Sequence, residues 1–507
     1  MTEAEEKSYI LAIDQGTTGT TTIIFDRNTH IVGRAYAPIR QIYPRPGWVE
    51  HDPVDIWNGV VKSIQEALER GRVSPAQIAA IGITNQRETT VLWERETGNP
   101  VHNAIVWQDR RTTEMCERLR KDGLEGEIHA KTGLVLDPYF SGTKIAWLLD
   151  NVAGLRERAS KGEILFGTID SWLIWNLTGG KAHRTDMSNA SRTLLFDIHK
   201  RQWDEDIINY FNIPMSMLPD VHPNSFRFGE LTPGLLGDDS PPIPITGAAG
   251  DQQAALFGQA CFTPGSIKAT YGTGAFLLIN TGEKPVESQN GLLTTIAWSY
   301  NNKVEYALEG STFIAGAAIQ WLRDELKLIK QASETEQMAM SVPDNGGVYI
   351  VPAFVGLGAP YWDSTARGAV FGLTRGSNRN HLARAALESI AYQVRDVLEA
   401  LKEDSGLDFE EIKVDGGATA NNFLMQFQAD MMGKTVVRPE IIETTALGSA
   451  YLAGLAVNYW GSQKEITNLW QTDRTFIPNM REELREKQYR LWKKAVSRAL
   501  EWDEGNE

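Results

Sequence analysis

Residues 10–26 read ILAIDQGTTGTTTIIFD, and this stretch decides the fold. An apolar run enters a turn of glycine and threonine, and a second apolar run leaves it, which predicts a β-hairpin. Its tip would offer backbone N–H groups, threonine hydroxyls and the Asp14 carboxylate, a combination that suits a metal-bound polyphosphate. The alternative is an ordinary hairpin with threonine-rich strands, because short motifs often occur by chance.

The same pattern returns at residues 267–279, which read IKATYGTGAFLLI. A strand, a Gly-Thr-Gly turn and another strand follow one another, roughly half a chain after the first copy. A repeat at this distance favours a shared function over coincidence. Two phosphate-binding hairpins predict two similar domains that close on one nucleotide.

Length and charge limit the classes of protein that fit. A chain of 507 residues is too long for one hydrophobic core, so we expect two large domains, residues 1–254 and 255–507. Hydrophobic residues make up 42% and charged residues 23%, as in ordinary folded proteins. The formal net charge of −15 argues against a nucleic-acid partner, whose phosphates require a basic surface.

Cysteine usage and hydropathy predict a cytoplasmic location. Cys116 and Cys261 are the only cysteines in the sequence, too few for a disulfide framework. The first residues lack the charged and apolar regions of a signal peptide. No apolar run is long enough for a transmembrane helix, so we expect no insertion into a membrane.

Strands and helices alternate through most of the sequence, which predicts α/β layers. In the first half, we expect an amphipathic helix at 53–70, strands at 77–84 and 101–108, and a helix at 110–121. In the second half, we expect a helix at 381–401 capped by Asn378 or Asn380, a strand at 412–417 and a helix at 421–432. The glycine turn between the last two is a second nucleotide candidate, because ligands of α/β sheets lie at the carboxyl ends of strands.

Two further segments bear on the organisation of the chain. Residues 219–244 are rich in Pro, Gly, Asp and Ser, which predicts a long surface loop, with the domain break just after it, near Ala254. Residues 481–500 carry an apolar stripe and are expected to form a packed terminal helix. The stripe consists of Leu484, Leu491, Trp492, Ala495, Val496 and Ala499.

The strongest candidate for catalysis lies in residues 247–258, GAAGDQQAALFG. Asp251 stands among small residues, which allow the backbone to approach closely. An apolar, helix-forming run follows it, so its carboxylate is expected at the start of a helix. One interpretation is an N-cap for that helix. The other is a catalytic base, because an aspartate that orients the attacking hydroxyl is a recurring part of phosphoryl-transfer sites. The two roles do not exclude each other.

A second polar cluster, TNQRETT at residues 84–90, ends a buried strand. Arg87 and Glu88 could bind neighbouring hydroxyls of a polyol, one as donor and one as acceptor. The alternative is an exposed turn with a surface ion pair of little energy. Tyr139, Trp107 and Phe276 are aromatic residues that also fit an ordinary core.

Other phosphate and metal motifs are absent from the sequence. Gly433-Lys434-Thr435 resembles the end of a P-loop, but Gln428 stands where its first glycine is required. The scattered histidines and two cysteines provide no zinc-binding spacing. Carboxylates at Asp14 and Asp251 suit Mg²⁺, which keeps waters and bridges nucleotide phosphates.

Taken together, the motifs resemble the FGGY carbohydrate kinase family, and within it the glycerol kinases. The similarity extends over nearly the whole chain in the same order, which is far more specific than any single motif. The segments that carry it are DQGTT (14–18), GITNQRET (82–89), IDSWLIW (169–175), GDQQAALFG (250–258), YGTG (271–274) and GLGAPYWD (356–363).

The resemblance implies an actin-like ATPase fold of the α/β class, with two ribonuclease-H-like domains flanking a catalytic cleft. It further implies that ATP and Mg²⁺ phosphorylate glycerol to sn-glycerol 3-phosphate, in glycerol uptake and catabolism, by a homodimer or homotetramer. In the family, the carboxylate matching Asp251 is the general base, and the carboxylates matching Asp14 and Asp251 hold the metal. The matching glycerol-binding positions are Arg87, Glu88, Tyr139, Asp251, Gln252, Trp107 and Phe276. The matching nucleotide-binding positions are Thr17, Thr18, Gly19, Thr21, Thr273, Gly316, Gln320, Gly417 and Asn421.

The chain departs from the family pattern at two places. Many relatives carry Ser-Ser-Arg after the two phosphate threonines, where this chain has Gly19-Thr20-Thr21, so a cationic contact to the nucleotide is missing or comes from elsewhere. Residues 230–244 lack the Gly/Arg pattern that binds fructose 1,6-bisphosphate in some relatives and contain no histidine for phosphorylation. A rival interpretation is a nucleotide-switched protein like actin or Hsp70, which would have no need for Arg87, Glu88 and Asp251 together.

Overall fold

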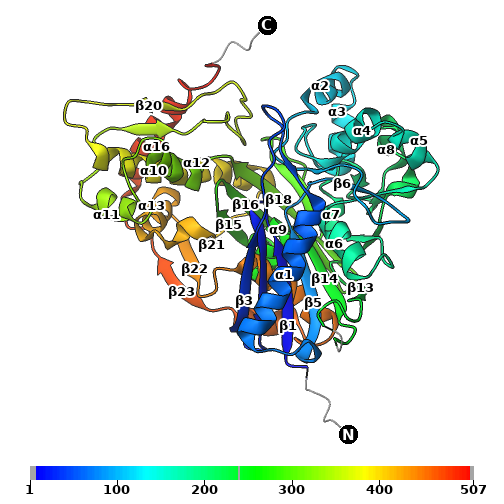
Figure 1. Ribbon diagram of the computed structural model, residues 1–507. Coiled ribbons are helices and arrows are strands. Elements are labelled where there is room, and N and C mark those ends of the chain that lie inside the picture. The colour runs from blue at the N-terminus through cyan, green and yellow to red at the C-terminus, as the bar shows by residue number, and fades with distance from the viewer. Residues whose placement is uncertain (1–6, 238–239, 503–507) are drawn as a thin grey trace.

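A computed structural model describes residues 7–237 and 240–502 of the chain. Residues 1–6, expected not to form a signal peptide, and residues 238–239 of the expected surface loop lie outside the described residues. Two large sheets, each covered by helices, organise the molecule (Figure 1).

The first sheet grows from the hairpin at the start of the chain. Strands β1 and β2 pair antiparallel with Asp14 opposite Thr21, β2 pairs antiparallel with β3, and β5 and β14 follow in parallel beside β1. The strand order is β13-β14-β5-β1-β2-β3. The bounds are β1 Tyr9–Gln15, β2 Gly19–Phe25, β3 Ile31–Pro38, β5 Ile78–Asn85, β13 Ser225–Glu230 and β14 Pro244–Gly250.

The second sheet repeats this topology. Strands β15, β16 and β18 form an antiparallel meander, and β21 and β22 continue in parallel beside β15. The strand order is β17-β18-β16-β15-β21-β22-β23. The bounds are β15 Ile267–Tyr271, β16 Ala275–Gly282, β17 Leu293–Tyr300, β18 Lys303–Thr312, β21 Glu411–Asp415, β22 Thr435–Pro439 and β23 Thr472–Phe476.

Both sheets therefore share the strand order 3-2-1-4-5 of a ribonuclease-H-like domain, and the pair forms the actin-like ATPase fold predicted from the two hairpins.

Strand β1 has a continuous apolar sequence because both of its faces are buried. Leu11 and Ile13 pack in the core beneath α1 (Pro53–Gly71), whereas Ile10 and Ala12 pack on the opposite face against α9 (Asp251–Gly258) and α14 (Thr444–Ala456). The last two helices touch closely, because a Cβ on Gly448 would lie 1.8 Å from the Ala254 carbonyl oxygen.

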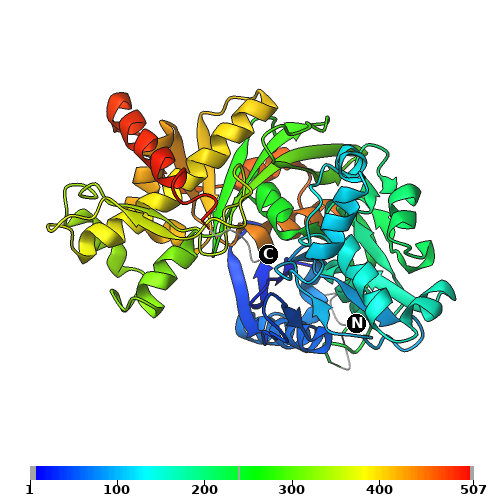
Figure 2. The same ribbon diagram turned by 90° about the horizontal axis from the view of Figure 1, so that it is seen from above.

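A helical region lies beside the first sheet, at the upper right of Figure 1. Seen from above, it lies on the opposite side of the molecule from the helices at the carboxyl end (Figure 2). Its helices are α2 Thr113–Lys121, α3 Glu125–Thr132, α4 Ser141–Asn151, α5 Leu155–Ser160, α6 Ile169–Leu177, α7 Met187–Ala190 and α8 Glu205–Tyr210.

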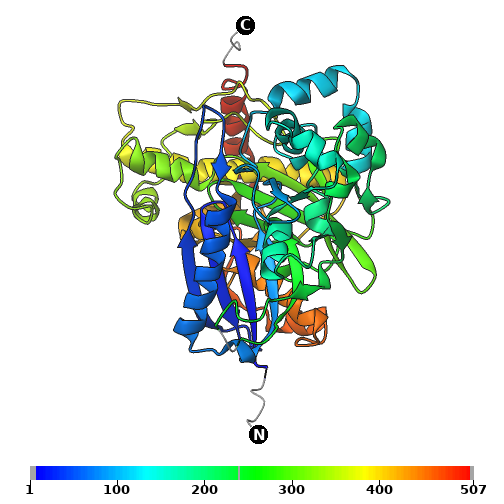
Figure 3. The same ribbon diagram turned by 45° about the vertical axis from the view of Figure 1, so that its right-hand side comes forward.

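The longest helix is α12 (Arg379–Ser405), which runs along the second sheet (Figure 3). Asn378 caps it, as expected, by accepting from the N–H groups of Asn380 and His381. The other helices of this half are α10 Gly316–Asp324, α11 Glu334–Met340, α13 Asn422–Met432, α15 Gln463–Leu469 and α16 Glu482–Val496. Short strands complete the fold: β4 Glu50–His51, β6 Val91–Glu94, β7 Ala104–Ile105, β8 Ile164–Gly167, β9 Arg184–Asp186, β10 Phe196–Asp197, β11 Gln202–Trp203, β12 Asp220–His222, β19 Tyr349–Val351 and β20 Ala369–Phe371.

Three expectations about the elements were wrong in part. Residues 219–244 do not form one long loop, because Phe228 is buried and β13 pairs with β14 at the edge of the first sheet. The strand expected at 101–108 is confined to β7. In α16, Leu484 and Leu491 are each 41% exposed, and the buried side of this helix is formed by Tyr489, Trp492, Ala495 and Val496.

None of the helices in the described part of the chain is both long and apolar enough to cross a membrane. The domain boundary near Ala254 stays a prediction. It falls inside α9, and α14 from the second half packs on the first sheet, so the two halves share a core.

Candidate active site

Each glycine-threonine turn is closed by one backbone hydrogen bond, but the first turn has four residues (16–19) and the second has three (272–274). Gly16 N–H donates to the Gly19 carbonyl at 2.9 Å, and Gly272 N–H donates to the Gly274 carbonyl at the same distance. Thr18 and Thr273 are exposed at the tips, and Thr21 lies in register with Asp14 on the face away from α1. Each tip therefore leaves hydroxyl groups open to a ligand.

Arg87 and Glu88 are buried, which contradicts the alternative of an exposed turn. Their side chains are only 2% and 1% exposed, and both lie within three residues of the end of β5 at Asn85. Arg87 Nε lies 3.2 Å from Asp251 Oδ1, and Arg87 Nη2 lies 3.4 Å from the Tyr139 hydroxyl. The structure thus brings together five of the expected polyol-binding residues, since Gln252 follows Asp251 at the start of α9.

Three charged residues near this cluster were missed in the sequence. Glu309 on β18 accepts hydrogen bonds from both Nη atoms of Arg87. Arg192 donates to Glu88, and Lys268 on β15 donates to Gln252. All three side chains are buried. Lys268 lies in a mainly apolar strand and Glu309 follows the apolar pair Ala307-Leu308, and this signal could have indicated buried charges with partners. Arg192, in a short turn after α7, gave no comparable signal.

Asp251 is the first residue of α9, and Gly250 occupies the N-cap position, so the N-cap interpretation was wrong. The Asp251 carboxylate accepts a hydrogen bond from the Gln252 N–H at 2.7 Å and its side chain is 29% exposed. Burial raises its pKa above the usual range, although Arg87 and Lys268 act in the opposite direction. A partly open carboxylate with a raised pKa suits proton transfer.

Asp14 lies near Asp251 at the end of β1. Burial, reinforced by the charges of Asp251 and Glu443, raises the pKa of Asp14 to about 8. No hydrogen bond in the described residues reaches its carboxylate. Such crowding of carboxylates is relieved by a cation. The described residues contain no group of three or more His, Cys, Asp or Glu side chains that would hold a metal by themselves. A site with few carboxylates and several waters fits Mg²⁺, which binds nucleotide phosphates in this way.

Three aromatic rings form a wall beside the polar cluster. The rings of Trp107 and Tyr139 pack edge to face with centroids 5.6 Å apart, and Trp107 and Phe276 do so at 6.5 Å. Trp107 and Phe276 are half-buried. Trp107 Nε1 also donates to Thr17 Oγ1 at 2.9 Å, which joins the aromatic wall to the first hairpin.

The other expected nucleotide positions gather around the second hairpin. The N–H groups of Ala315 and Ala317 donate to the Thr273 carbonyl, and that of Gly316 donates to the Gly272 carbonyl. Gln320 is exposed one turn later on α10.

The glycine turn after β21 meets the same hairpin, because a Cβ on Gly416 would lie 2.5 Å from the Tyr271 carbonyl oxygen. Gly417 is exposed in this turn. Asn421 caps α13 by accepting from the Leu424 N–H, so its carboxamide also has a structural role.

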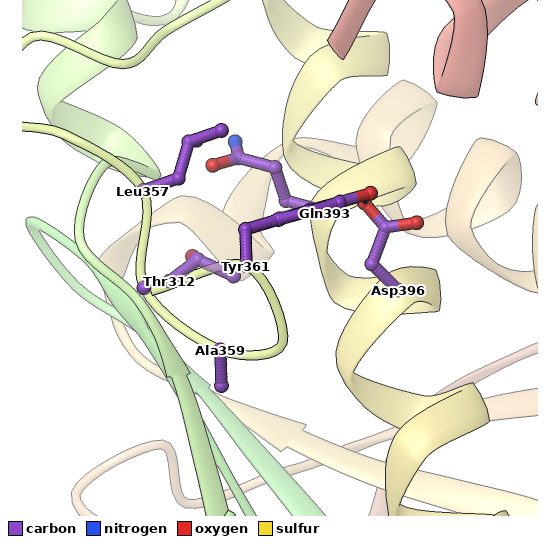
Figure 4. A pocket seen from close by; sticks show the side chains of 7 residues that line it. Thr312, Leu357, Ala359, Tyr361, Gln393 and Asp396 are labelled. Atoms are coloured by element: carbon purple, nitrogen blue, oxygen red, sulfur yellow. Dashed lines mark hydrogen bonds between the residues drawn. The ribbon is translucent and has the colours of Figure 1, made fainter. Parts of the chain in front are cut away.

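A small cavity lies behind this hairpin, beside the loop that carries GLGAPYWD (Figure 4). Gln393 and Asp396 of α12 line it together with Tyr361, whose hydroxyl donates to Asp396 at 2.9 Å. Trp492 of α16 donates to the same carboxylate at 2.8 Å. Its volume of about 10 Å³ is room for one water, too little for a substrate. These contacts fix the loop in place.

Comparison with known proteins identifies the family. The patterns of the FGGY family of carbohydrate kinases match this chain twice, the N-terminal domain at residues 9–258 and the C-terminal domain at residues 267–457. The chain belongs to the FGGY family of carbohydrate kinases. The enzyme interpretation is thereby confirmed over a non-enzymatic nucleotide switch.

Relatives of this FGGY kinase match over nearly their full length. Glycerol kinase 2 of Thermotoga maritima is 61% identical, covering 98% of this chain and 99% of that protein. A glycerol kinase of Caldanaerobacter subterraneus subsp. tengcongensis is 60% identical with the same coverage. The crystal structure of Plasmodium falciparum glycerol kinase with ADP is 41% identical and superposes with a TM-score of 0.91 over 98% of this chain and 99% of that one.

Proposed function

We propose that this kinase transfers the γ-phosphoryl group of ATP to a terminal hydroxyl of glycerol, giving sn-glycerol 3-phosphate and ADP. The observation that carries the proposal is the buried cluster of Arg87, Glu88 and Asp251 beside an aromatic wall. The names of the relatives at about 60% identity support the same substrate.

The cluster matches the chemistry of a small polyol. Three hydroxyls on three carbons need closely spaced donors and acceptors, which Arg87, Glu88, Asp251, Gln252 and Tyr139 supply. Trp107 and Phe276 would cover the carbon atoms. A site with such buried polar groups rejects analogues that leave them unpaired.

Asp251 is the proposed general base. Its carboxylate would accept the proton of the terminal hydroxyl while the oxygen of that hydroxyl bonds to the γ-phosphorus and the bond to the ADP oxygen breaks. The partly exposed carboxylate and its raised pKa support this role. Arg87 Nε, 3.2 Å away, holds the carboxylate in place.

The nucleotide would lie between the two hairpins. We assign its contacts to Thr17, Thr18, Gly19, Thr21, Thr273, Gly316, Gln320, Gly417 and Asn421. Asp14 and Asp251 would hold Mg²⁺ through its waters, and the ion supplies charge neutralisation at the phosphates. A role in glycerol uptake and catabolism, a cytoplasmic location and a homodimer or homotetramer complete the proposal.

The test is stereospecific identification of the product. The enzyme is incubated with ATP, Mg²⁺ and glycerol, and the product is offered to an sn-glycerol-3-phosphate dehydrogenase, with ADP measured in parallel. The proposal predicts equal amounts of ADP and oxidisable product. ADP formation that does not depend on glycerol would contradict it.

A further inference from the structure

Four buried charges form a closed cluster behind the polyol site, which we call the four-charge cluster: Arg87, Glu88, Arg192 and Glu309. Each side chain is at most 2% exposed. Arg87 Nη2 donates to Glu309 Oε1 at 2.8 Å, with Nη1 on the other oxygen, so the pair is bidentate. Arg192 donates through Nε to Glu88 Oε1 at 2.7 Å and through Nη2 to Glu309 Oε1 at 3.1 Å. Two arginines and two glutamates give the cluster a formal net charge of zero.

The members come from separate parts of the fold. Arg87 and Glu88 follow β5 of the first sheet, Arg192 follows α7, and Glu309 lies on β18 of the second sheet. Arg192 also lies over the rings of Phe140 and Tyr139, with its guanidinium carbon 5.4 and 5.8 Å from their centroids. Glu309 of the second sheet thus holds Arg87, which follows a strand of the first sheet, in place.

The two acids of the cluster differ in electrostatics: burial raises the pKa of Glu88, whereas that of Glu309 is lowered. Burial alone would raise the pKa of Glu309, but the opposing effects of Arg192 and Arg87 outweigh it and hold the value at about 2. Glu309 is therefore an anion at neutral pH. Bidentate pairs between arginine and a carboxylate add directional precision to their charge attraction.

This arrangement determines which atoms remain for a ligand. Because Glu309 occupies both Nη atoms of Arg87, the Nε edge of that guanidinium faces Asp251. Because Arg192 occupies Oε1 of Glu88, its Oε2 atom is left without a hydrogen bond in the described residues. One donor edge and one acceptor atom are thereby oriented before any substrate binds.

We propose that Glu309 and Arg192 are positioning residues for glycerol: they orient Arg87 and Glu88 so that Glu88 Oε2 accepts from a glycerol hydroxyl. This inference rests on the proposed function. Neither residue touches the substrate. Without the Glu309 charge, two guanidinium groups share one carboxylate, and Arg87 turns toward Glu88 and Asp251, where it competes with the polyol.

The test is steady-state kinetics of Glu309→Gln and Arg192→Lys with glycerol and ATP varied separately. Each substitution weakens charge-assisted hydrogen bonds that orient Arg87 and Glu88. The free energy of such bonds is large enough that their loss should raise the KM for glycerol about 10- to 100-fold. The KM for ATP should change by less than about 3-fold. Glu309→Asp, which keeps the charge on a shorter side chain, should recover part of the loss. A purely structural role would instead lower the amount of active enzyme without separating the two KM values.

Glu305→Gln is the matched control, because Glu305 lies four residues earlier on the same face of β18 and is outside the cluster. It should leave both KM values within about 2-fold of the wild type. If Glu309→Gln does not fold, Arg192→Lys decides by the same separation of KM values.

The outcomes separate the two proposals. A wild-type enzyme that does not phosphorylate glycerol overturns the proposed function. A wild-type enzyme that does, with Glu309 and Arg192 variants whose glycerol KM stays within about 2-fold, overturns only the positioning role.

Discussion

Replacing Asp251 by asparagine removes the proposed base while keeping the shape of the side chain. The amide oxygen can still accept from the Gln252 N–H and face Arg87 Nε, the two contacts that hold the carboxylate at 2.7 and 3.2 Å. The amide cannot take a proton from glycerol. A general base typically contributes 10²- to 10⁴-fold, so kcat should fall by about that factor. The KM for glycerol should rise only about 3-fold, because a charged hydrogen bond is replaced by a neutral one.

The pH profile gives a second readout of the same change. A base acts in its deprotonated form, so wild-type activity should be lost as the pH falls through the raised pKa of Asp251. Asp251→Asn should lack this decline, because no group at position 251 titrates.

The assay couples ADP release to NADH oxidation at saturating ATP and glycerol. Asp26→Asn is the control: Asp26 accepts from Asn28 and His30 in the turn at the other end of β2 and should leave kcat unchanged. If Asp251→Asn retains kcat within about 10-fold of the wild type, the base assignment is refuted.

The remaining predictions concern the nucleotide side and pH. Gly316→Ala should raise the KM for ATP about 10-fold, because a Cβ there would lie 2.6 Å from a carbonyl oxygen of the second hairpin. Gly417→Ala should leave thermal stability unchanged, because its Cβ meets nothing within 4 Å, yet raise the KM for ATP if the nucleotide occupies that space. Trp107→Phe removes the donor to Thr17 and should raise the KM for ATP about 3- to 10-fold, whereas an unchanged value would show that the bond has no role there. Burial lowers the pKa of His183 from 6.5 to about 4, so the unfolded state binds more protons and stability should fall as the pH drops through this range. The loss should reach about 3 kcal/mol and shrink in His183→Gln, measured by urea unfolding at each pH.

The fold was predictable where local pattern and topology agree. The hairpin around Asp14 and its copy around Thr273 each place apolar strands on either side of a glycine turn, and the structure forms both. The capped helix after Asn378 was also clear from its periodicity. The polar composition of residues 219–244 wrongly predicted a single loop. Part of this segment forms the edge strand β13, which needs to bury only one face, and Phe228 is buried on that face.

The site was predictable only for residues inside motifs. Arg87, Glu88 and Asp251 belong to segments that resemble the family, whereas Glu309 and Arg192 do not. Their importance depends on contacts between residues more than a hundred positions apart in the chain. Such contacts arise from the packing of the two sheets, so the local sequence could at most mark Glu309 as a charge within a strand and gave no sign of its partners.

The most direct measurement is a substrate panel. Glycerol, dihydroxyacetone, xylulose and gluconate are each offered with ATP and Mg²⁺, and kcat/KM is determined from ADP release. We expect glycerol to have the highest kcat/KM, because the cluster of Arg87, Glu88 and Asp251 fits three adjacent hydroxyls. A higher kcat/KM for xylulose or gluconate would contradict it.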